Sequence, residues 1–344
     1  MPSSFDSLAH VKSLQNGRTV SDKAQIKKTQ TEIKHHQANI AILGAGAIGL
    51  LIYTQLAKFR APLLLTRNTI ESNRYITVET LSGEIKQQAC LEANIEQLEQ
   101  ADLANIELVI ICVKSYQIAD ALSSLLPIIP KACHILLIHN GMGPHLEAQA
   151  MLKPYDKLNL GISLGTTSQA SLKLSQRHIR HTGKGKSVIG HLTGSAMPVA
   201  VMSQLMSSIP DISIKDDILT ALWQKLIVNC AINPLTAINQ CPNGELAQQI
   251  YQQQIHAIAQ ECITVAKADG VNLDLADSLS VIADVIHQTA ANSSSMKQDI
   301  QLGRKTEIKQ INGYVVARAK CHQLAVPVNE HMLCNINALE ALQG

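Results

Sequence analysis

Three polar side chains interrupt an apolar segment at regular intervals. The segment 222–238 reads LWQKLIVNCAINPLTAI, and Lys225, Asn229 and Asn233 follow one another at steps of four. On an α-helix, this spacing places the three side chains along one stripe. Burying a lysine is costly unless it is paired or faces a cleft, because its charge loses contact with water. An ammonium in a cleft can polarise a carbonyl group and protonate its oxygen, so we predict general acid chemistry at Lys225.

Each polar position also has a purely structural interpretation. Lys225 could extend to solvent at a helix edge while its stem covers core. Asn233 stands before a proline and would suit the N-cap of a helix that restarts there. Asn243, in CPNGE, suits a turn. Ser295, with a glutamine three positions later, fits a capping box. From the residues alone, these alternatives stay open.

Glu307 is a second candidate for chemistry. If the chain is helical from 306 to 322, Glu307 shares an apolar face with Ile311 and, further back, with Ile300. A carboxylate among apolar residues needs a partner, and Lys225 has the same need. We therefore predict that the two side chains belong to one cleft. Gly303 is the residue at which this helical pattern could break.

A glycine-rich segment, GAGAIG, predicts a dinucleotide-binding loop. Its glycines have GxGxxG spacing, after an apolar strand (39–43) and at the start of an apolar helix. The first glycine permits a tight turn, the second admits a pyrophosphate, and the third lets helix and strand pack closely. The alternative is an ordinary glycine-rich turn. The predicted cofactor-binding loop comprises Gly44, Ala45, Gly46, Ala47, Ile48 and Gly49.

The residues after three further strands favour NADP(H). The second strand ends near Thr66 and is followed by Arg67, with no carboxylate before Glu71. NAD sites usually place an acidic residue here, whereas an arginine can bind the 2′-phosphate of NADP. Lys114 and Asn140 follow the next two strands, where ligands of such sheets bind. Lys114 would pair with a cofactor phosphate, and Asn140 would contact nicotinamide ribose or substrate; each could instead be a polar loop residue.

The pattern of elements predicts two domains. Apolar strands alternate with helices up to residue 214, which indicates a parallel sheet covered on both faces. Helical patterns follow, at 216–239, 245–269, 275–290, 295–302, 306–322 and 328–342. The predicted fold is an α/β N-terminal Rossmann-type parallel sheet plus an all-α C-terminal domain. We expect a disordered tail (1–38), an NADP-binding domain (39–214) and a helical substrate and catalytic domain (215–344).

Composition excludes several classes of function. The chain has 344 residues, a net charge of +2 and 3% aromatic residues, which argues against nucleic-acid binding. No apolar run is long enough for a membrane span, and no secretory signal is recognisable. Eight cysteines without a CxxC pair fit a reducing compartment, so we expect a cytoplasmic protein. We predict no metal site, because His35 and His36 lack further ligands.

Several motifs together resemble the ketopantoate reductase (2-dehydropantoate 2-reductase) family. They extend from about residue 39 to 325, in the family's order: ILGAGAIG, VKSYQ, LLIHNGMG, LWQKLIVNCAINPLTAI, CPNGEL and SSMKQDI…GRKTEIKQING. The block 222–246 is long and specific. Lys305 and Lys309 depart from the family, which often has proline and aspartate there, and the N-terminal tail lies outside the family pattern.

The resemblance implies an activity and assigns residues to it. The family reduces the 2-keto group of ketopantoate to pantoate with NADPH, in the pathway to pantothenate and coenzyme A. The implied catalytic residues are Lys225 and Glu307. The implied NADP(H) contacts are the glycine loop, Arg67, Lys114, Asn140 and Glu307. The implied substrate contacts are Asn140, Lys225, Asn229, Asn233, Asn243, Asn292, Ser294 and Ser295.

Two other functions remain compatible with the residues. One is a related NADP-dependent reductase of another 2-keto acid, and the other is a non-catalytic NADP-binding regulator. A regulator has no reason to keep Lys225 and Glu307 together. The expected partner is a small-molecule 2-keto acid, and the sequence leaves monomer and homodimer equally open.

Overall fold

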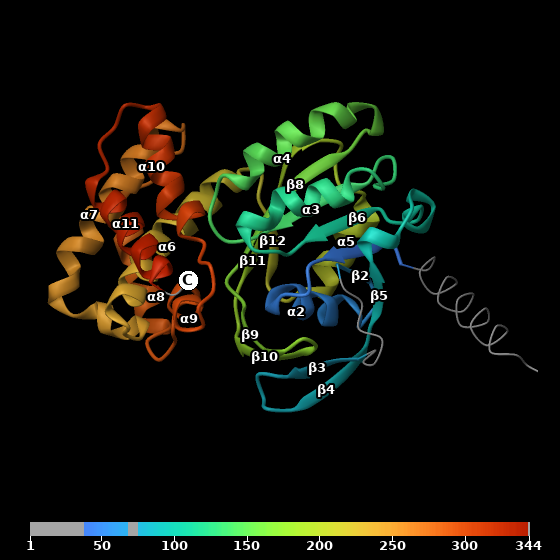
Figure 1. The fold of residues 1–344 in the computed structure, drawn as a ribbon, viewed down its shortest axis with the longest axis horizontal. Helices are drawn as coiled ribbons and strands as arrows, with labels where there is room; N and C mark the ends of the chain where they lie inside the picture. Colours follow the sequence, from blue (N-terminus) through green and yellow to red (C-terminus); the bar gives the residue numbers. More distant parts are fainter. Residues whose placement is uncertain (1–37, 68–74, 343–344) are drawn as a thin grey trace, which may run out of the picture.

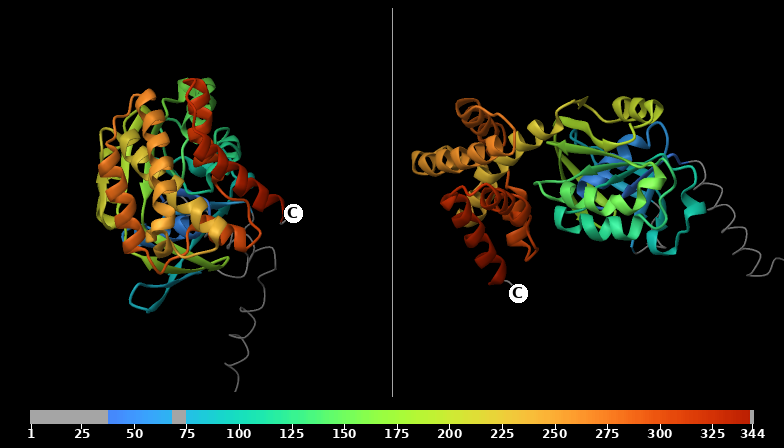
Figure 2. Two further views of the ribbon diagram at one scale, coloured as in Figure 1. Left: turned by 90° about the vertical axis from the view of Figure 1, so that its left-hand side faces the viewer. Right: turned by 90° about the horizontal axis from the view of Figure 1, so that it is seen from above.

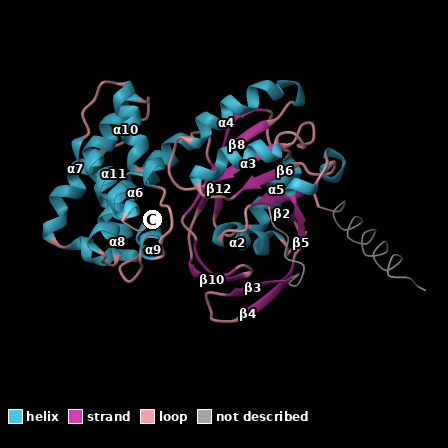
Figure 3. Cartoon of the chain, viewed as in Figure 1, coloured by secondary structure: helices cyan, strands magenta, loops and turns pink. Residues whose placement is uncertain are grey.

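Two bodies lie side by side in the computed structural model, which describes residues 38–67 and 75–342 (Figure 1). The α/β body holds every strand that the structure describes, and the helical body holds α6 to α11 (Figure 3). The tail predicted for residues 1–38 lies outside the described residues, except for Ala38. Among the helices that the structure describes, none is both long enough and apolar enough to span a membrane.

An eight-stranded sheet forms the centre of the α/β body. Its strand order is β12-β11-β8-β7-β6-β1-β2-β5. All neighbouring strands run parallel except β8 and β11, which are antiparallel, so the predicted parallel sheet is confirmed with one exception. The strands are β1 Ile40–Leu43, β2 Leu63–Thr66, β5 Leu91–Asn94, β6 Leu108–Ile111, β7 His134–Ile138, β8 Gly161–Thr167, β11 Ser187–Gly194 and β12 Ile212–Ile214.

Helices cover both faces of this sheet. Along β1, Ala41 and Leu43 pack in the cluster that includes α3, whereas Ile40 and Ile42 pack in the cluster that includes α2 and α5. This period of two explains why the central strands are apolar throughout, because each face meets its own layer. The helices of this body are α2 Ala47–Leu56, α3 Ile118–Leu125, α4 Pro144–Leu152 and α5 Val199–Ser208; its 3-10 helices are η1 Ile95–Gln97, η2 Gln100–Leu103, η3 Ser115–Gln117 and η4 Lys153–Leu158.

A second, four-stranded sheet was not predicted. Its order is β4-β3-β10-β9, with β3 Tyr75–Glu79, β4 Ile85–Ala89, β9 Ala170–Ser175 and β10 His178–Gly183. It lies on the α2 side of the body (Figure 1), where β9 and β10 contact α2. Strands such as β4, IKQQA, are polar and mostly exposed, so they lack the apolar run that identified the central strands.

The helical body is built around α6 Ile218–Asn239. This helix packs against β8 and β11 and against α7, α8, α9 and α11, and Figure 2 shows it leading from the α/β body into the helical one. Asp217 caps its start by accepting from the backbone of Thr220 at 3.1 Å. The remaining elements are η5 Asn243–Ala247, α7 Gln249–Ala268, α8 Leu275–Gln288, α9 Ser295–Gln301, η6 Ile308–Gln310, α10 Asn312–Cys321 and α11 Pro327–Ala341.

Three local expectations are corrected. Pro234 lies inside α6, so Asn233 is not the N-cap of a restarted helix. The chain turns at Gly303, with φ +61°, after α9, and the helix expected over 306–322 begins only at residue 312, after the non-helical backbone of Ile311. Glu307 therefore precedes η6 in a tight turn and is not part of the α10 face.

Candidate active site

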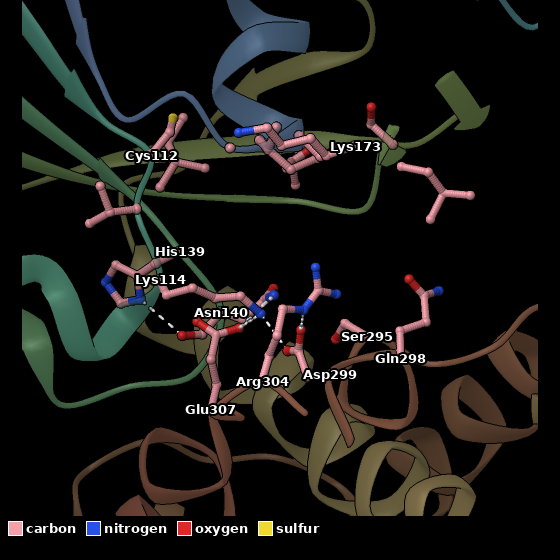
Figure 4. Close-up of a pocket in the computed structure, with 18 of the residues that line it drawn as sticks. Cys112, Lys114, His139, Asn140, Lys173, Ser295, Gln298, Asp299, Arg304 and Glu307 are labelled. Carbon is pink, nitrogen blue, oxygen red and sulfur yellow. Dashed lines mark hydrogen bonds and ion pairs between the residues drawn. The ribbon is translucent and has the colours of Figure 1, made fainter. Parts of the chain in front are cut away.

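A cavity of about 530 Å³ lies between the two bodies and is called the inner cavity here (Figure 4). The α/β body contributes the glycine loop, the ends of β6, β7 and β8, and part of β9. The helical body contributes Lys225 from α6 and side chains between Ser295 and Glu307. The carboxyl ends of three parallel strands thus meet the helical body at one place, which is where ligands of such sheets bind.

Lys225 lines this cavity. Its Nζ donates to Asn140 Oδ1 at 3.1 Å and to the backbone oxygen of Thr167 at 2.7 Å. Burial lowers the pKa of Lys225 to about 8, and the nearby charge of Glu307 offsets part of this effect. Such an ammonium remains mostly charged at neutral pH but releases its proton more readily than an exposed lysine. The side chain lies in the cleft and does not extend along a solvent-exposed helix edge.

Glu307 is held by donors from the α/β body. Its Oε1 accepts from the backbone and hydroxyl of Ser115 at 2.9 and 2.7 Å, and its Oε2 accepts from Asn140 Nδ2 at 3.2 Å. The Lys114 ammonium lies 3.9 Å from Oε2. Glu307 and Lys225 are therefore joined through Asn140, whose amide has one acceptor and one donor end to serve both.

Lys114 forms an ion pair that sequence reasoning missed. Its Nζ lies 2.6 Å from Asp299 Oδ2, and Arg304 Nε lies 3.1 Å from Asp299 Oδ1. Burial tends to lower the pKa of Lys114, but Glu307 and Asp299 outweigh it and the net pKa is raised. Asp299 lies in α9, whose sequence SMKQDIQ is mostly polar, so the apolar surroundings that identified Glu307 were absent here.

The glycine loop has the close packing that its motif requires. A Cβ at Gly44, where φ is +120°, would lie 2.6 Å from the Cys112 carbonyl oxygen. A Cβ at Gly49 would lie 2.1 Å from the Gly44 carbonyl oxygen. Gly46 is the N-cap of α2 and provides no side-chain cap, so the first amides of the helix are left for an anion. These features fit a dinucleotide pyrophosphate.

A second cavity of about 380 Å³, the outer cavity, adjoins the first along the glycine loop. It is lined by the loop, by the end of β2 and by Arg67. Arg67 is exposed and lies 3.9 Å from Asp120, so its guanidinium is accessible at the rim. Glu71 lies outside the described residues. The two cavities together offer an extended site along the carboxyl edge of the sheet.

Only some of the predicted substrate-binding residues lie at the inner cavity. Of the Asn292–Ser295 segment, Ser295 alone lines the inner cavity. Ser294 caps α9: its Oγ accepts from Lys297 N at 3.1 Å and from Thr236 Oγ1 at 2.7 Å. This corrects the capping box expected at Ser295, because the helix begins one residue earlier than a cap at Ser295 would require.

The predicted asparagines lie further inside the helical body. Asn229 is half-buried and Asn233 is 8% exposed, one and two turns along α6 from Lys225. Asn243 donates to Thr289 Oγ1 at 2.9 Å, and its backbone amide donates to the Asn292 carbonyl at 3.0 Å. None of these four asparagines lines the described inner cavity.

Further residues of the cavity were not anticipated. His139 lines it beside Asn140, and burial lowers the pKa of this imidazole. Thr167 contributes its backbone carbonyl, which accepts from Lys225, a contact that no sequence pattern can reveal. Lys173 comes from the unpredicted strand β9. No group of three or more side chains suited to a metal ion occurs within residues 38–67 and 75–342.

Known proteins resemble this chain over nearly all of its described length. Models described as "Ketopantoate reductase PanE/ApbA" and "Ketopantoate reductase PanE/ApbA C terminal" match residues 40–194 and 217–340. A 2-dehydropantoate 2-reductase of Escherichia coli O157:H7 is 34% identical over 303 residues, covering 85% of this chain and 92% of that protein.

Solved structures agree in architecture. A PanE/ApbA family ketopantoate reductase from Ralstonia eutropha JMP134 has a TM-score of 0.75 at 27% identity, covering 88% of this chain and 99% of that one. D-mandelate dehydrogenase with NADH and anilino(oxo)acetate has a TM-score of 0.81 at 22% identity, covering 88% and 98%, and is similar in fold. With the glycine loop and the Lys225–Asn140–Glu307 chain within the matched residues, the protein belongs to the ketopantoate reductase family.

Proposed function

We propose that this protein is an oxidoreductase that reduces 2-dehydropantoate (ketopantoate) to pantoate with NADPH, a step towards pantothenate and coenzyme A. Family membership supports the activity. The observation that carries the mechanism is the Lys225 ammonium, held by Asn140 and the Thr167 carbonyl inside the cavity between the bodies. NADPH, when bound, supplies the hydride for the keto carbon.

Lys225 is the proposed general acid. It holds a proton at Nζ and transfers it to the keto oxygen as negative charge develops there, a contribution of about 10²–10⁴-fold for a positioned acid. Asn140 orients the ammonium, and Glu307 holds Asn140 through its Nδ2. Glu307 also places negative charge near Lys225, which favours the protonated form before the reaction.

The substrate would be held mainly by the helical body. Ser295, at the cavity wall, is our candidate for the carboxylate. Asn229 and Asn233 are candidates for polar substrate groups, because they continue along α6 from Lys225. For Asn243, Asn292 and Ser294, which do not line the inner cavity, the proposed role is indirect: their hydrogen bonds hold the start of α9, which carries Ser295.

NADP(H) is the proposed cofactor. The glycine loop 44–49 would hold the pyrophosphate at the start of α2. Arg67, at the rim of the outer cavity, would bind the 2′-phosphate. Lys114, Asn140 and Glu307 line the inner cavity and would lie against the nicotinamide half.

A substrate panel tests the proposed function. The purified protein is mixed with NADPH or NADH and with ketopantoate or other 2-keto acids, and the fall in cofactor absorbance is followed. We expect the highest kcat/KM for ketopantoate with NADPH. Faster turnover of another 2-keto acid would reassign the substrate, and equal use of NADH would remove the 2′-phosphate role of Arg67.

We also propose a cytoplasmic location. All eight cysteines are free, and the five buried ones, at 112, 133, 230, 241 and 262, are at most 7% exposed. Free thiols persist most readily in a reducing compartment. Fractionation of the native host's cells with antibody detection would test this.

A further inference from the structure

One cation beside the glycine loop has no part in the function proposed above. Lys173, in β9, lines both the inner and the outer cavity. Its Nζ donates to the backbone oxygen of Ala45 at 2.7 Å, and Figure 4 shows the amine reaching towards the start of α2. Because β9 belongs to the four-stranded sheet, this contact connects that sheet directly with the dinucleotide-binding loop.

The surroundings of this ammonium are electropositive. Burial, and secondarily the charge of Arg177, lower the pKa of Lys173. The start of α2 adds partial positive charge from its free amides. Within the described ranges no carboxylate forms an ion pair with Lys173, whose hydrogen-bond partner is the neutral Ala45 carbonyl. Lys114 also lines both cavities, but Asp299 compensates its charge at 2.6 Å.

The Lys173 ammonium and the partial positive charge at the start of α2 repel each other, and an anion between them would stabilise both. The amides of Ala47 and Ile48 and the Lys173 ammonium approach the loop from different elements, α2 and β9. A negatively charged group at the loop would therefore contact both backbone donors and the Lys173 ammonium. The dinucleotide pyrophosphate is the part of NADP(H) that carries charge at this position.

We propose that Lys173 is a pyrophosphate-binding residue, supplied to the dinucleotide site by the four-stranded sheet. The inference rests on the proposed function, since it requires a dinucleotide in the glycine loop. It deepens that function by assigning a phosphate contact from outside the strand–loop–helix unit. The four-stranded sheet would then both cover α2 and contribute to the binding affinity for the cofactor.

Binding of cofactor fragments tests the proposal. Dissociation constants for NADPH, ADP-ribose and 2′-AMP are measured by calorimetry with the wild type, Lys173→Met and Lys173→Arg. ADP-ribose contains the pyrophosphate, whereas 2′-AMP contains only the 2′-phosphate. For Lys173→Met we expect about tenfold weaker binding of NADPH and ADP-ribose, the usual effect of one lost charge-assisted hydrogen bond, and 2′-AMP binding within about twofold. Lys173→Arg keeps the charge and should stay within about threefold.

Lys184→Met is the matched control, because Lys184 is exposed between β10 and β11 and lines neither cavity. It loses the same charge and should bind all three ligands like the wild type. The proposal is overturned if Lys173→Met binds ADP-ribose normally, if it weakens 2′-AMP equally, or if Lys184→Met has the same effect. A wild type that binds ADP-ribose without preferring NADPH would refute the NADP preference, while the ADP-ribose comparison would still decide the role of Lys173.

Discussion

Among the described residues, Lys225 has two hydrogen-bond partners, and both are uncharged: the Asn140 amide oxygen and the Thr167 backbone carbonyl. A carboxylate in direct contact would raise the pKa of the lysine and hold its proton more tightly. Placing Glu307 behind Asn140 keeps the attraction at longer range, so burial remains the larger effect and the net pKa is lowered. Asn140 thus orients the Lys225 ammonium, while Glu307 stabilises its charged form from a greater distance.

Lys225→Met should separate activity from stability. We expect kcat to fall by about 10²–10⁴-fold, since a general acid is lost, while the dissociation constant for NADPH changes little. The free energy of unfolding at neutral pH should rise by about 1–2 kcal/mol, because the folded state no longer buries an ammonium. Stopped-flow single turnovers and urea denaturation measure the two effects. A variant that keeps kcat within tenfold would exclude Lys225 as the acid.

The pH dependence follows from the same residue. The reaction needs Lys225 protonated, and its pKa of about 8 lies below that of a free lysine. The kcat/KM for reduction should therefore be constant at neutral pH and fall as pH rises through about 8. In Glu307→Gln the charge that raises this pKa is absent, so the fall should move to lower pH. An unchanged profile in Glu307→Gln would contradict the electrostatic connection.

At the scale of elements, the strand–loop–helix unit from β1 to α2 tolerates no side chain at its third glycine. The Gly49 Cα faces the Gly44 carbonyl, where a Cβ would lie at 2.1 Å. Helix and loop would have to separate to admit a methyl group. The close contact between Gly49 and the Gly44 carbonyl therefore determines where the first α2 amides lie and whether they can hydrogen-bond to an anion.

Gly49→Ala should lower both stability and cofactor affinity. We expect a loss of about 1–3 kcal/mol in the free energy of unfolding from overpacking and at least tenfold weaker NADPH binding. Gly83→Ala is the control: φ at Gly83 is +83°, but a Cβ there meets nothing within 4 Å. That variant should lose about 1 kcal/mol from backbone strain alone and bind NADPH normally. Comparable NADPH affinity in both variants would exclude a special role for the Gly49 contact.

The success of prediction from sequence varied with the type of element. The central strands were found because burial on both faces makes them apolar throughout, as in β6, LVII. The strands of the four-stranded sheet were missed because they are half-exposed and interrupted by polar residues, so they lack the continuous apolar run that marks the central strands. Lys173 was missed with them, since its strand was unknown.

In the candidate site, the sequence predicted individual residues but not the contacts between them. Lys225 and Glu307 were identified because charges among apolar residues need an explanation. Their connection through Asn140 depends on tertiary geometry that spacing cannot encode. Glu307 lies before the expected helix, because the backbone of Ile311 departs from helical geometry and this local conformation overrode the apolar pattern.

At the scale of the whole molecule, the cavity walls are held together by contacts between the bodies. Lys114 of the α/β body pairs with Asp299 of the helical body. Lys305 lies over the Tyr116 ring at 4.6 Å from its centroid. Because these contacts surround the candidate site, the relative position of the bodies and the geometry of the site depend on one another.

Asp299→Ala should weaken the association of the two bodies. The change leaves Lys114 and Arg304 without their shared, almost fully buried carboxylate, but both cations are partly exposed, so we expect a loss of about 1–2 kcal/mol in stability. Asp120→Ala removes an exposed partner of Arg67 and should cost less than about 1 kcal/mol. Thermal unfolding followed by calorimetry measures both. Equal midpoints for the two variants would show that the Lys114–Asp299 pair does not contribute to holding the bodies together.

The turn after β7 is completed by a residue far along the chain. The Met142 amide donates to the Gln310 carbonyl at 2.8 Å, and a Cβ on Gly141 would lie 2.3 Å from that same oxygen. The ribosome synthesises the chain from its N-terminus. Some 170 further residues must therefore be added after this turn before the Gln310 carbonyl exists, which takes roughly ten seconds or more of translation. Until then, water must hydrogen-bond to the Met142 amide. The candidate site of the nascent chain therefore stays incomplete even after its sheet has folded.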